Sequence, residues 1–182
     1  YYFDNSGTNN WATFATSGVY QVCSRYPEFR RYEHWMQRVK EKNAYCFTGN
    51  TFEDGMCSES PLGYASTILD TFDVPVLVSV ASGNELPFTE EMKLKIKDIV
   101  YTLINGRGPT GGSFNIADDH SFKSDNTSTV KFWYDYMFTD DEVMEWFVTK
   151  GISGTEPYAT TRYPISMRTY MRTGWGKRDL MM

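Results

Sequence analysis

Two aspartates and a histidine stand next to one another in the chain and are its strongest candidates for acid–base chemistry. His120 directly follows Asp118 and Asp119, and the three residues come after a short stretch, 113–117, that is typical of a strand. Carboxylates beside an imidazole raise its pKa and hold it in one orientation. His120 is therefore a candidate general acid or base, with Asp119 as its carboxylate neighbour. The alternative interpretation is a polar turn at the surface.

The same three side chains also offer oxygen and nitrogen ligands, but a metal site needs a further ligand of suitable geometry. We therefore expect no metal and no cofactor. The chain's other histidine, His34, lies within a predicted helix and away from its apolar stripe, so it should face solvent. The glycine-rich segment 106–112 lacks the Gly-Lys-Ser/Thr ending of a phosphate-binding loop.

Nucleophilic chemistry would require one of three cysteines, all in the first third of the chain: Cys23, Cys46 and Cys57. Their spacing contains no Cys-x-x-Cys pair, which argues against zinc binding and thioredoxin-like redox chemistry. One disulfide with one free thiol and three reduced thiols are both compatible with the sequence. Asn126 begins an Asn-Thr-Ser tripeptide, the acceptor pattern for N-glycosylation, which fits a secreted or lumenal glycoprotein.

Three segments have the features of helices. Residues 27–41 carry apolar side chains at helical spacing, with Pro27 in the first turn. Residues 89–105 have the clearest apolar stripe in the chain, with Thr89 placed to cap the start and Gly106 to end the helix. The sequence Thr-Asp-Asp-Glu at 139–142 forms a capping box that should open a third helix, stopped by Gly151.

Four segments are typical of strands and set the predicted fold class. The β-branched run Val74–Val80 suits a buried strand, and the segments 11–17, 113–117 and 130–138 are also predicted strands. Strands that alternate with helices favour an α/β fold with a mostly parallel sheet flanked by helices. An α+β arrangement is the alternative. We expect one domain over residues 1–182, which could be incomplete at either end.

Composition limits the classes of partner. The net charge of −5 lacks the basic surface of a nucleic-acid-binding protein, so no nucleic acid is expected. No apolar run reaches about 18 residues, which predicts no transmembrane segment. Aromatic residues make up 16% of the chain, which suits a surface that binds a protein or peptide partner, as in a subunit of a larger complex.

The last stretch is locally basic, with five cations at positions 162–178 against Asp179. It is either a solvated face or a segment that docks on a partner or a membrane.

Several short stretches, in their order along the chain, resemble the legumain family of cysteine peptidases, in particular the branch that contains the catalytic subunit of the GPI-anchor transamidase. The stretches that carry the resemblance are 8–12 (TNNWA), 53–57 (EDGMC), 103–107 (LINGR), 119–121 (DHS) and 158–161 (YATT). The resemblance implies a caspase-like fold in a protein of the secretory pathway. It also implies attack by a cysteine thiolate on an acyl carbon after an Asn-type residue, with His120 as the acid–base group beside Asp119.

The nucleophile of that family is missing from its expected place. The best-matching stretch puts Gly151 where the cysteine should stand, and no cysteine follows Cys57. The resemblance therefore predicts a caspase-fold domain that is catalytically incomplete in this form. The alternative is a noncatalytic extracytoplasmic binding or assembly module with an aromatic-rich surface. A metal-dependent enzyme built on Asp118, Asp119 and His120 is a third hypothesis. In each case we expect secretion or a lumenal location.

Overall fold

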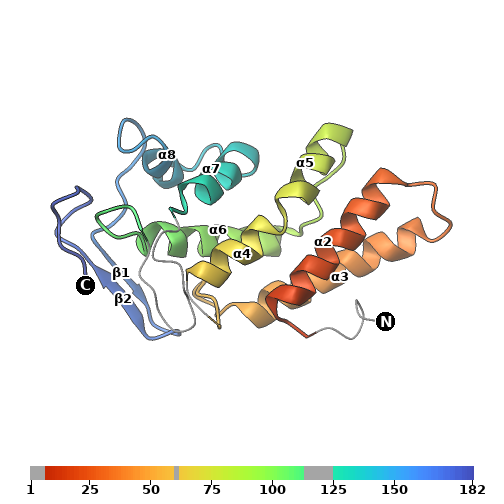
Figure 1. The fold of residues 1–182 in the computed structure, drawn as a ribbon, viewed down its shortest axis with the longest axis horizontal. Coiled ribbons are helices and arrows are strands. Elements are labelled where there is room, and N and C mark those ends of the chain that lie inside the picture. The colour runs from red at the N-terminus through yellow and green to blue at the C-terminus, as the bar shows by residue number, and fades with distance from the viewer. Residues whose placement is uncertain (1–6, 60–61, 113–124) are drawn as a thin grey trace.

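The computed structural model describes residues 7–59, 62–112 and 125–182. Most of these residues are helical, and the described strands form one small sheet (Figure 1). The elements in chain order are α2 (Asn10–Arg25), α3 (Tyr32–Asn50), α4 (Gly63–Asp70), α5 (Asp73–Ser82), α6 (Glu90–Asn105), α7 (Thr127–Tyr136), α8 (Glu142–Val148), β1 (Thr160–Tyr163) and β2 (Arg168–Met171). The prediction of a mostly parallel, caspase-like sheet is therefore wrong.

Helix α6 runs through the middle of the molecule and behaves as its sequence predicts (Figure 1). The Thr89 side chain accepts a hydrogen bond from Met92 N at 3.2 Å, and Gly106 follows the last turn. The predicted apolar stripe is buried: Met92, Ile96, Ile99, Val100 and Leu103. An amphipathic helix of this kind is stable because one whole face leaves water.

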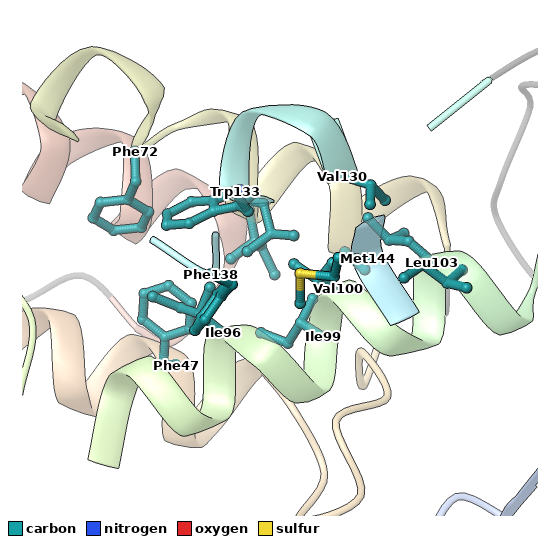
Figure 2. Close-up of a cluster of buried hydrophobic side chains, with 14 of the residues drawn as sticks. Phe47, Phe72, Ile96, Ile99, Val100, Leu103, Val130, Trp133, Phe138 and Met144 are labelled. Atoms are coloured by element: carbon teal, nitrogen blue, oxygen red, sulfur yellow. The ribbon is translucent and has the colours of Figure 1, made fainter. Parts of the chain in front are cut away.

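The core lies where α4, α7 and α8 pack over α6 (Figure 2). Phe47 of α3 contacts Phe72, which contacts Phe88, and Phe88 contacts Trp133 of α7. Their ring centroids are 5.2, 5.5 and 6.1 Å apart in that order, within the range of favourable aromatic pairs. This chain of rings joins the first half of the sequence to the second.

Three of the predicted strands are helical. Residues 11–17 belong to α2, Val74–Val80 to α5, and 130–138 largely to α7. A short apolar run has the same composition in a buried strand as in a buried helix, so periodicity does not separate them. In α5 the buried residues Pro75, Val76 and Ser79 share one helical face, and Ser79 Oγ forms a hydrogen bond with Tyr20 Oη of α2. The fourth predicted strand, 113–117, lies outside the described residues.

Helices α2 and α3 lie side by side at one end of the molecule (Figure 1). The helix predicted for 27–41 begins only at Tyr32 and continues to Asn50, well past its predicted end. His34 is exposed on α3, as predicted. Cys23, Cys46 and Cys57 are buried and none of them is joined in a disulfide, which is the three-thiol arrangement.

The stretch Gly63–Ser82, which contains α4 and α5, is long and apolar enough to cross a membrane by length and composition alone. In this structure it is interrupted between Asp70 and Asp73, and 44% of its most apolar window is buried inside the protein. The sequence predicted no transmembrane segment, whereas this stretch meets the length and composition of one. Its most buried apolar side chains belong to the core described above.

The β1–β2 hairpin lies at the opposite end from α2 and α3 (Figure 1). The strands are antiparallel, with Thr160 opposite Met171 and Tyr163 opposite Arg168. A carboxylate far away in sequence holds the turn, because Asp54 Oδ2 accepts hydrogen bonds from Ile165 N and Ser166 N at 3.0 and 2.9 Å. Met182 pairs with Met171 on the free edge of β2 through two backbone hydrogen bonds.

Candidate functional site

The residues that the sequence proposed for catalysis do not form a described site. His120, Asp118 and Asp119 lie outside the described residues. Gly151, at the expected position of the nucleophile, is in the turn after α8 with a φ of 82°. Burial raises the pKa of the Cys23 and Cys46 thiols, whereas a nucleophilic cysteine needs a lowered pKa.

The glycosylation pattern at Asn126 and the acidic residues at 140–142 both lie at the starts of helices. Asn126, the predicted glycan acceptor, is buried at the start of α7. Asp141 caps α8, accepting hydrogen bonds from Val143 N and Met144 N, while Thr139 of the expected capping box is exposed. Within the described ranges, no group of three or more His, Cys, Asp or Glu residues is arranged to hold a metal ion.

A different place has the features of a binding site: a pocket of about 220 Å³ near the end of α6. Three segments line it, namely the loop 107–111, the end of α8 with its following turn, and the basic stretch near the C-terminus. Four of the lining residues are cationic and two carry indole rings: Arg107, Lys150, Arg172, Lys177, Trp146 and Trp175. The basic stretch at 162–178, for which a solvated face was one interpretation, thus contributes Arg172 and Lys177 to the lining of this pocket.

The loop after α6 forms one wall. Gly106 ends the helix, and a tight turn follows in which Gly108 N donates to Gly112 O at 2.7 Å. Gly111 has a φ of 95°, and a Cβ atom there would lie 3.4 Å from the Arg107 guanidinium. The turn thus depends on a glycine to pass close to that cation.

Arg107 connects this loop to α7 and α8. Its guanidinium donates to Thr127 Oγ1 at 3.1 Å, lies 3.9 Å from the Asp125 carboxylate, and stands 4.8 Å from the centre of the Phe147 ring. Burial opposes ionisation of Asp125, but hydrogen bonds from Thr127 and the charges of Arg107 and Lys150 lower the pKa of that carboxyl group. Part of the Arg107 guanidinium is therefore already engaged in contacts within the fold.

Arg172 is more fully enclosed. Its guanidinium donates hydrogen bonds to the carbonyl oxygens of Asn105 and Arg107, where α6 ends, and its Cζ atom lies 3.5 Å from the centre of the Trp175 ring. Burial lowers the pKa of Arg172 to about 10, so the side chain is still protonated at neutral pH. A cation at this end of a helix is favoured by the helix dipole.

Two indole rings form the apolar part of the pocket. Trp175 Nε1 donates to Pro157 O at 2.9 Å, which fixes one edge of the ring. Its centroid lies 5.5 Å from that of Trp146 on α8, with the ring planes at 70°. An indole is a broad apolar surface with a polar edge, so this pair suits a ligand that has both apolar faces and charged groups. A sugar ring with acidic substituents has that combination.

Comparison with protein families shows the family to which the chain belongs. The family model described as "Heparinase II/III N-terminus" matches residues 1–146, well over half of the 182-residue chain. The chain belongs to the heparinase II/III N-terminus family. No curated protein matches it at a significant level. Membership in the heparinase II/III N-terminus family is compatible with an extracytoplasmic location, the coarser part of the location predicted from the sequence.

Solved structures have the same fold as this heparinase II/III N-terminus chain. Heparinase III, the BT4657 gene product, is 18% identical with a TM-score of 0.84, and the match covers 98% of this chain and 28% of that one. The heparan sulfate lyase HepC from Pedobacter heparinus is 20% identical with a TM-score of 0.73, covering 93% of this chain and 27% of that one. A further heparinase III structure is 17% identical with a TM-score of 0.76, covering 95% and 28%. The chain thus spans little more than a quarter of the length of these proteins.

The resemblance to legumain-type cysteine peptidases is therefore wrong, and so is the function drawn from it. The matched stretches were three to five residues long, and two of them lie in helices of this family's fold: 8–12 at the start of α2 and 103–107 at the end of α6. Stretches of that length recur by chance in unrelated folds. The interpretation of the chain as a caspase-like or legumain-like cysteine peptidase homologue is wrong for the same reason.

The locally basic stretch of the sequence indicated two of the pocket's four cations, Arg172 and Lys177, but it indicated neither Arg107 and Lys150 nor the paired indoles. Trp146 lies in α8 and Trp175 lies 29 positions later, so nothing local indicates that the rings meet. A signal was present in the segment 174–177, where Trp175 stands between two glycines and before Lys177. An aromatic residue between glycines, next to a cation, is unusual for a core position and more typical of a binding loop.

Proposed function

We propose that this chain is the helical part of a lyase that acts on an acidic polysaccharide of the heparin and heparan sulfate class, and that its cationic pocket binds the polysaccharide. Membership in the heparinase II/III N-terminus family supports the proposal, as do the names of the similar structures. The observation that carries it is the pocket itself, where Lys150, Lys177 and Arg107 surround the indoles of Trp146 and Trp175.

The charge distribution explains why a local cluster is needed. This chain has a net charge of −5, so its overall charge repels a polyanion at long range. Cations gathered in a partly enclosed pocket attract carboxylate and sulfate groups more strongly than the same cations spread over the surface. We therefore expect modest affinity that falls steeply as salt is added.

The cleavage reaction is proposed for a protein of the length seen in the similar structures, because this chain spans only 27–28% of them. A secreted or lumenal location is part of the same proposal, since sulfated polysaccharides occur outside cells. The predicted protein or peptide partner and the predicted place in a larger complex stay predictions, as does the single domain over 1–182.

The test is calorimetric titration of the purified chain with size-defined heparan sulfate oligosaccharides at low and moderate salt. We expect saturable binding that weakens as salt rises, and no heat with dextran, a neutral polysaccharide. Equal binding to dextran and heparan sulfate would contradict the proposal, and so would the absence of binding by folded protein at low salt. For a longer version of the protein, the appearance of an unsaturated uronate absorbance on incubation with heparan sulfate would test the reaction itself.

A further inference from the structure

The four cations of the pocket differ in what already surrounds them. Arg172 is half-buried and donates to two backbone carbonyls while it stacks on Trp175. Arg107 is half-buried too, with Thr127, Asp125 and Phe147 around its guanidinium. Lys150 and Lys177 are exposed, and within the described ranges neither ammonium group has an ion pair. The two lysines are the cations with room for a ligand.

The backbone at Lys150 is held in an unusual conformation. Lys150 has a φ of 57°, in the left-handed region that residues other than glycine seldom adopt. Two hydrogen bonds that close the end of α8 keep it there, from Lys150 N to Phe147 O at 3.3 Å and from Gly151 N to Trp146 O at 2.8 Å. The position from which the Lys150 side chain leaves the backbone is thus tied to the backbone of the turn of α8 that carries Trp146.

The backbone near Lys177 is also fixed. Asp179 closes the loop that carries it, because its carboxylate accepts from Thr173 Oγ1 at 3.1 Å and from Gly176 N at 2.6 Å. Thr173 Oγ1 in turn accepts from Leu180 N at 3.0 Å. These hydrogen bonds close the loop that carries both Trp175 and Lys177.

We propose that Lys150 and Lys177 bind the acidic groups of a saccharide that lies against Trp146 and Trp175, and that Arg172 is a positioning residue that holds Trp175 in place. This inference rests on the proposed function and adds to it which residues contact the ligand. Arg172 is unsuited to direct contact, since its donors face the end of α6 and its planar face covers the indole. The acidic group is a sulfate or a carboxylate, which an ammonium group binds equally well as a point charge.

The first experiment compares Lys150→Ala and Lys177→Ala with two control variants, Lys93→Ala on α6 and Lys131→Ala on α7. Both control lysines form surface ion pairs away from the pocket, with Glu90 and Asp135. We expect each pocket variant to weaken binding of a heparan sulfate octasaccharide roughly fivefold. The salt dependence should also fall by about one released counterion per lysine removed. The controls should bind within about twofold of the unmodified chain.

The second experiment tests Arg172 with Arg172→Lys, which keeps the charge but loses the planar stack and the paired donors. We expect affinity to fall as far as in the lysine variants, together with a red shift in tryptophan emission as Trp175 loosens. Lys150→Ala should leave the emission unchanged. Trp175→Leu provides a second measurement if Arg172→Lys does not fold, because it should lose affinity with every cation still present. Full affinity and unchanged emission in Arg172→Lys, or full affinity in Trp175→Leu, would overturn the positioning role.

Titration with an unsulfated, N-acetylated polymer of the same backbone identifies the acidic group. If the lysine effects persist with this polymer, the lysines bind carboxylate, and if they vanish, they bind sulfate. A folded chain that binds no acidic polysaccharide refutes the proposed function, whereas strong binding that neither lysine variant changes refutes only the assignment of these residues.

Discussion

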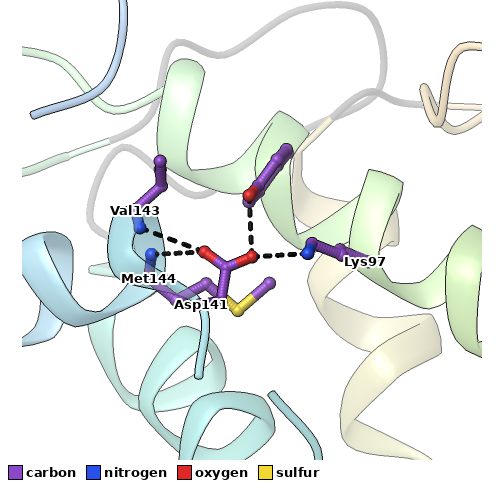
Figure 3. Close-up of polar contacts among 5 residues, drawn as sticks. Lys97, Asp141, Val143 and Met144 are labelled. Carbon is purple, nitrogen blue, oxygen red and sulfur yellow. Dashed lines mark hydrogen bonds and ion pairs between the residues drawn. The ribbon is translucent and has the colours of Figure 1, made fainter. Parts of the chain in front are cut away.

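The Oδ2 atom of Asp141 lies 2.7 Å from Nζ of Lys97, which joins the start of α8 to the middle of α6 (Figure 3). The same oxygen accepts a hydrogen bond from Tyr101 Oη at 2.8 Å, and Oδ1 accepts from Val143 N and Met144 N at 3.1 and 2.9 Å. Only 4% of the Asp141 side chain is exposed. One carboxylate therefore both caps α8 and attaches it to α6, close to the wall that carries Trp146.

We expect Asp141→Ala to lower the free energy of unfolding by about 3 kcal/mol, since it removes a helix cap and leaves a cation and a hydroxyl without their partner. Denaturant unfolding followed by circular dichroism measures this. Lys97→Met should lower the free energy of unfolding by clearly less, because Lys97 reaches the surface and Asp141 keeps its other three hydrogen-bond donors. As a control, Lys93→Ala on the same helix should be nearly neutral. A loss below about 1 kcal/mol for Asp141→Ala would show that the carboxylate does not hold the two helices together.

Asp73 gives the unfolding free energy a specific pH dependence. Burial, with a contribution from the Asp70 charge, raises the pKa of Asp73 from 3.8 to about 7, although its place in the first turn of α5 favours the charged form. Between these pH values the folded chain holds the proton more tightly than the unfolded chain, so stability should fall as pH rises from about 4 to about 7. Asp73→Asn should flatten this part of the profile and raise stability at neutral pH by about 1 kcal/mol, the full shift being reduced by partial exposure.

Thermal unfolding of both forms at a series of pH values checks this second prediction. The exposed Asp135 offers a matched control, since Asp135→Asn should leave the shape of the profile unchanged. An Asp73→Asn profile that runs parallel to that of the unmodified chain would contradict the assignment.

The turn of the β1–β2 hairpin should depend on Asp54. Its carboxylate accepts from the backbone N–H groups of Ile165 and Ser166 and from Ser166 Oγ. Asp54→Ala should therefore speed amide hydrogen exchange at Ile165 and Ser166 strongly and cost about 2 kcal/mol, as is usual for hydrogen bonds to a charged group. Asp54→Asn keeps one acceptor oxygen and should give an intermediate result. Unchanged exchange at both amides in Asp54→Ala would refute the prediction.

Truncation of Trp133 should destabilise the fold more than truncation of other core side chains (Figure 2). The side chain is fully buried against Phe88 and Phe132, and its Nε1 atom has no hydrogen-bond partner in the described part of the structure. Trp133→Ala should cost about 4 kcal/mol through the cavity that it leaves. Trp133→Phe should cost much less, since it removes the unsatisfied N–H along with part of the ring. Urea unfolding measures both, and equal losses would contradict this explanation.

Local features of the sequence determined α6 and α8. Thr89, the apolar stripe and Gly106 all indicate the same helix, and the acidic residues 140–142 indicate the start of α8, although Asp141 rather than Thr139 became the cap. These signals work because they act within one or two turns of chain, where capping and side-chain spacing do not depend on distant residues.

The tertiary structure alone decided that Val74–Val80 and most of 130–138 are helical, and that a pocket exists near the end of α6. An apolar run takes the conformation that buries it best against its neighbours, and those neighbours come from elsewhere in the chain: Tyr20 for α5 and Phe88 for α7. The pocket arises in the same way, since Arg172 reaches back over more than 60 positions to the end of α6 and brings Trp175 against Trp146. Contacts at such separations leave no periodic trace in the sequence, because they depend on how already formed helices pack.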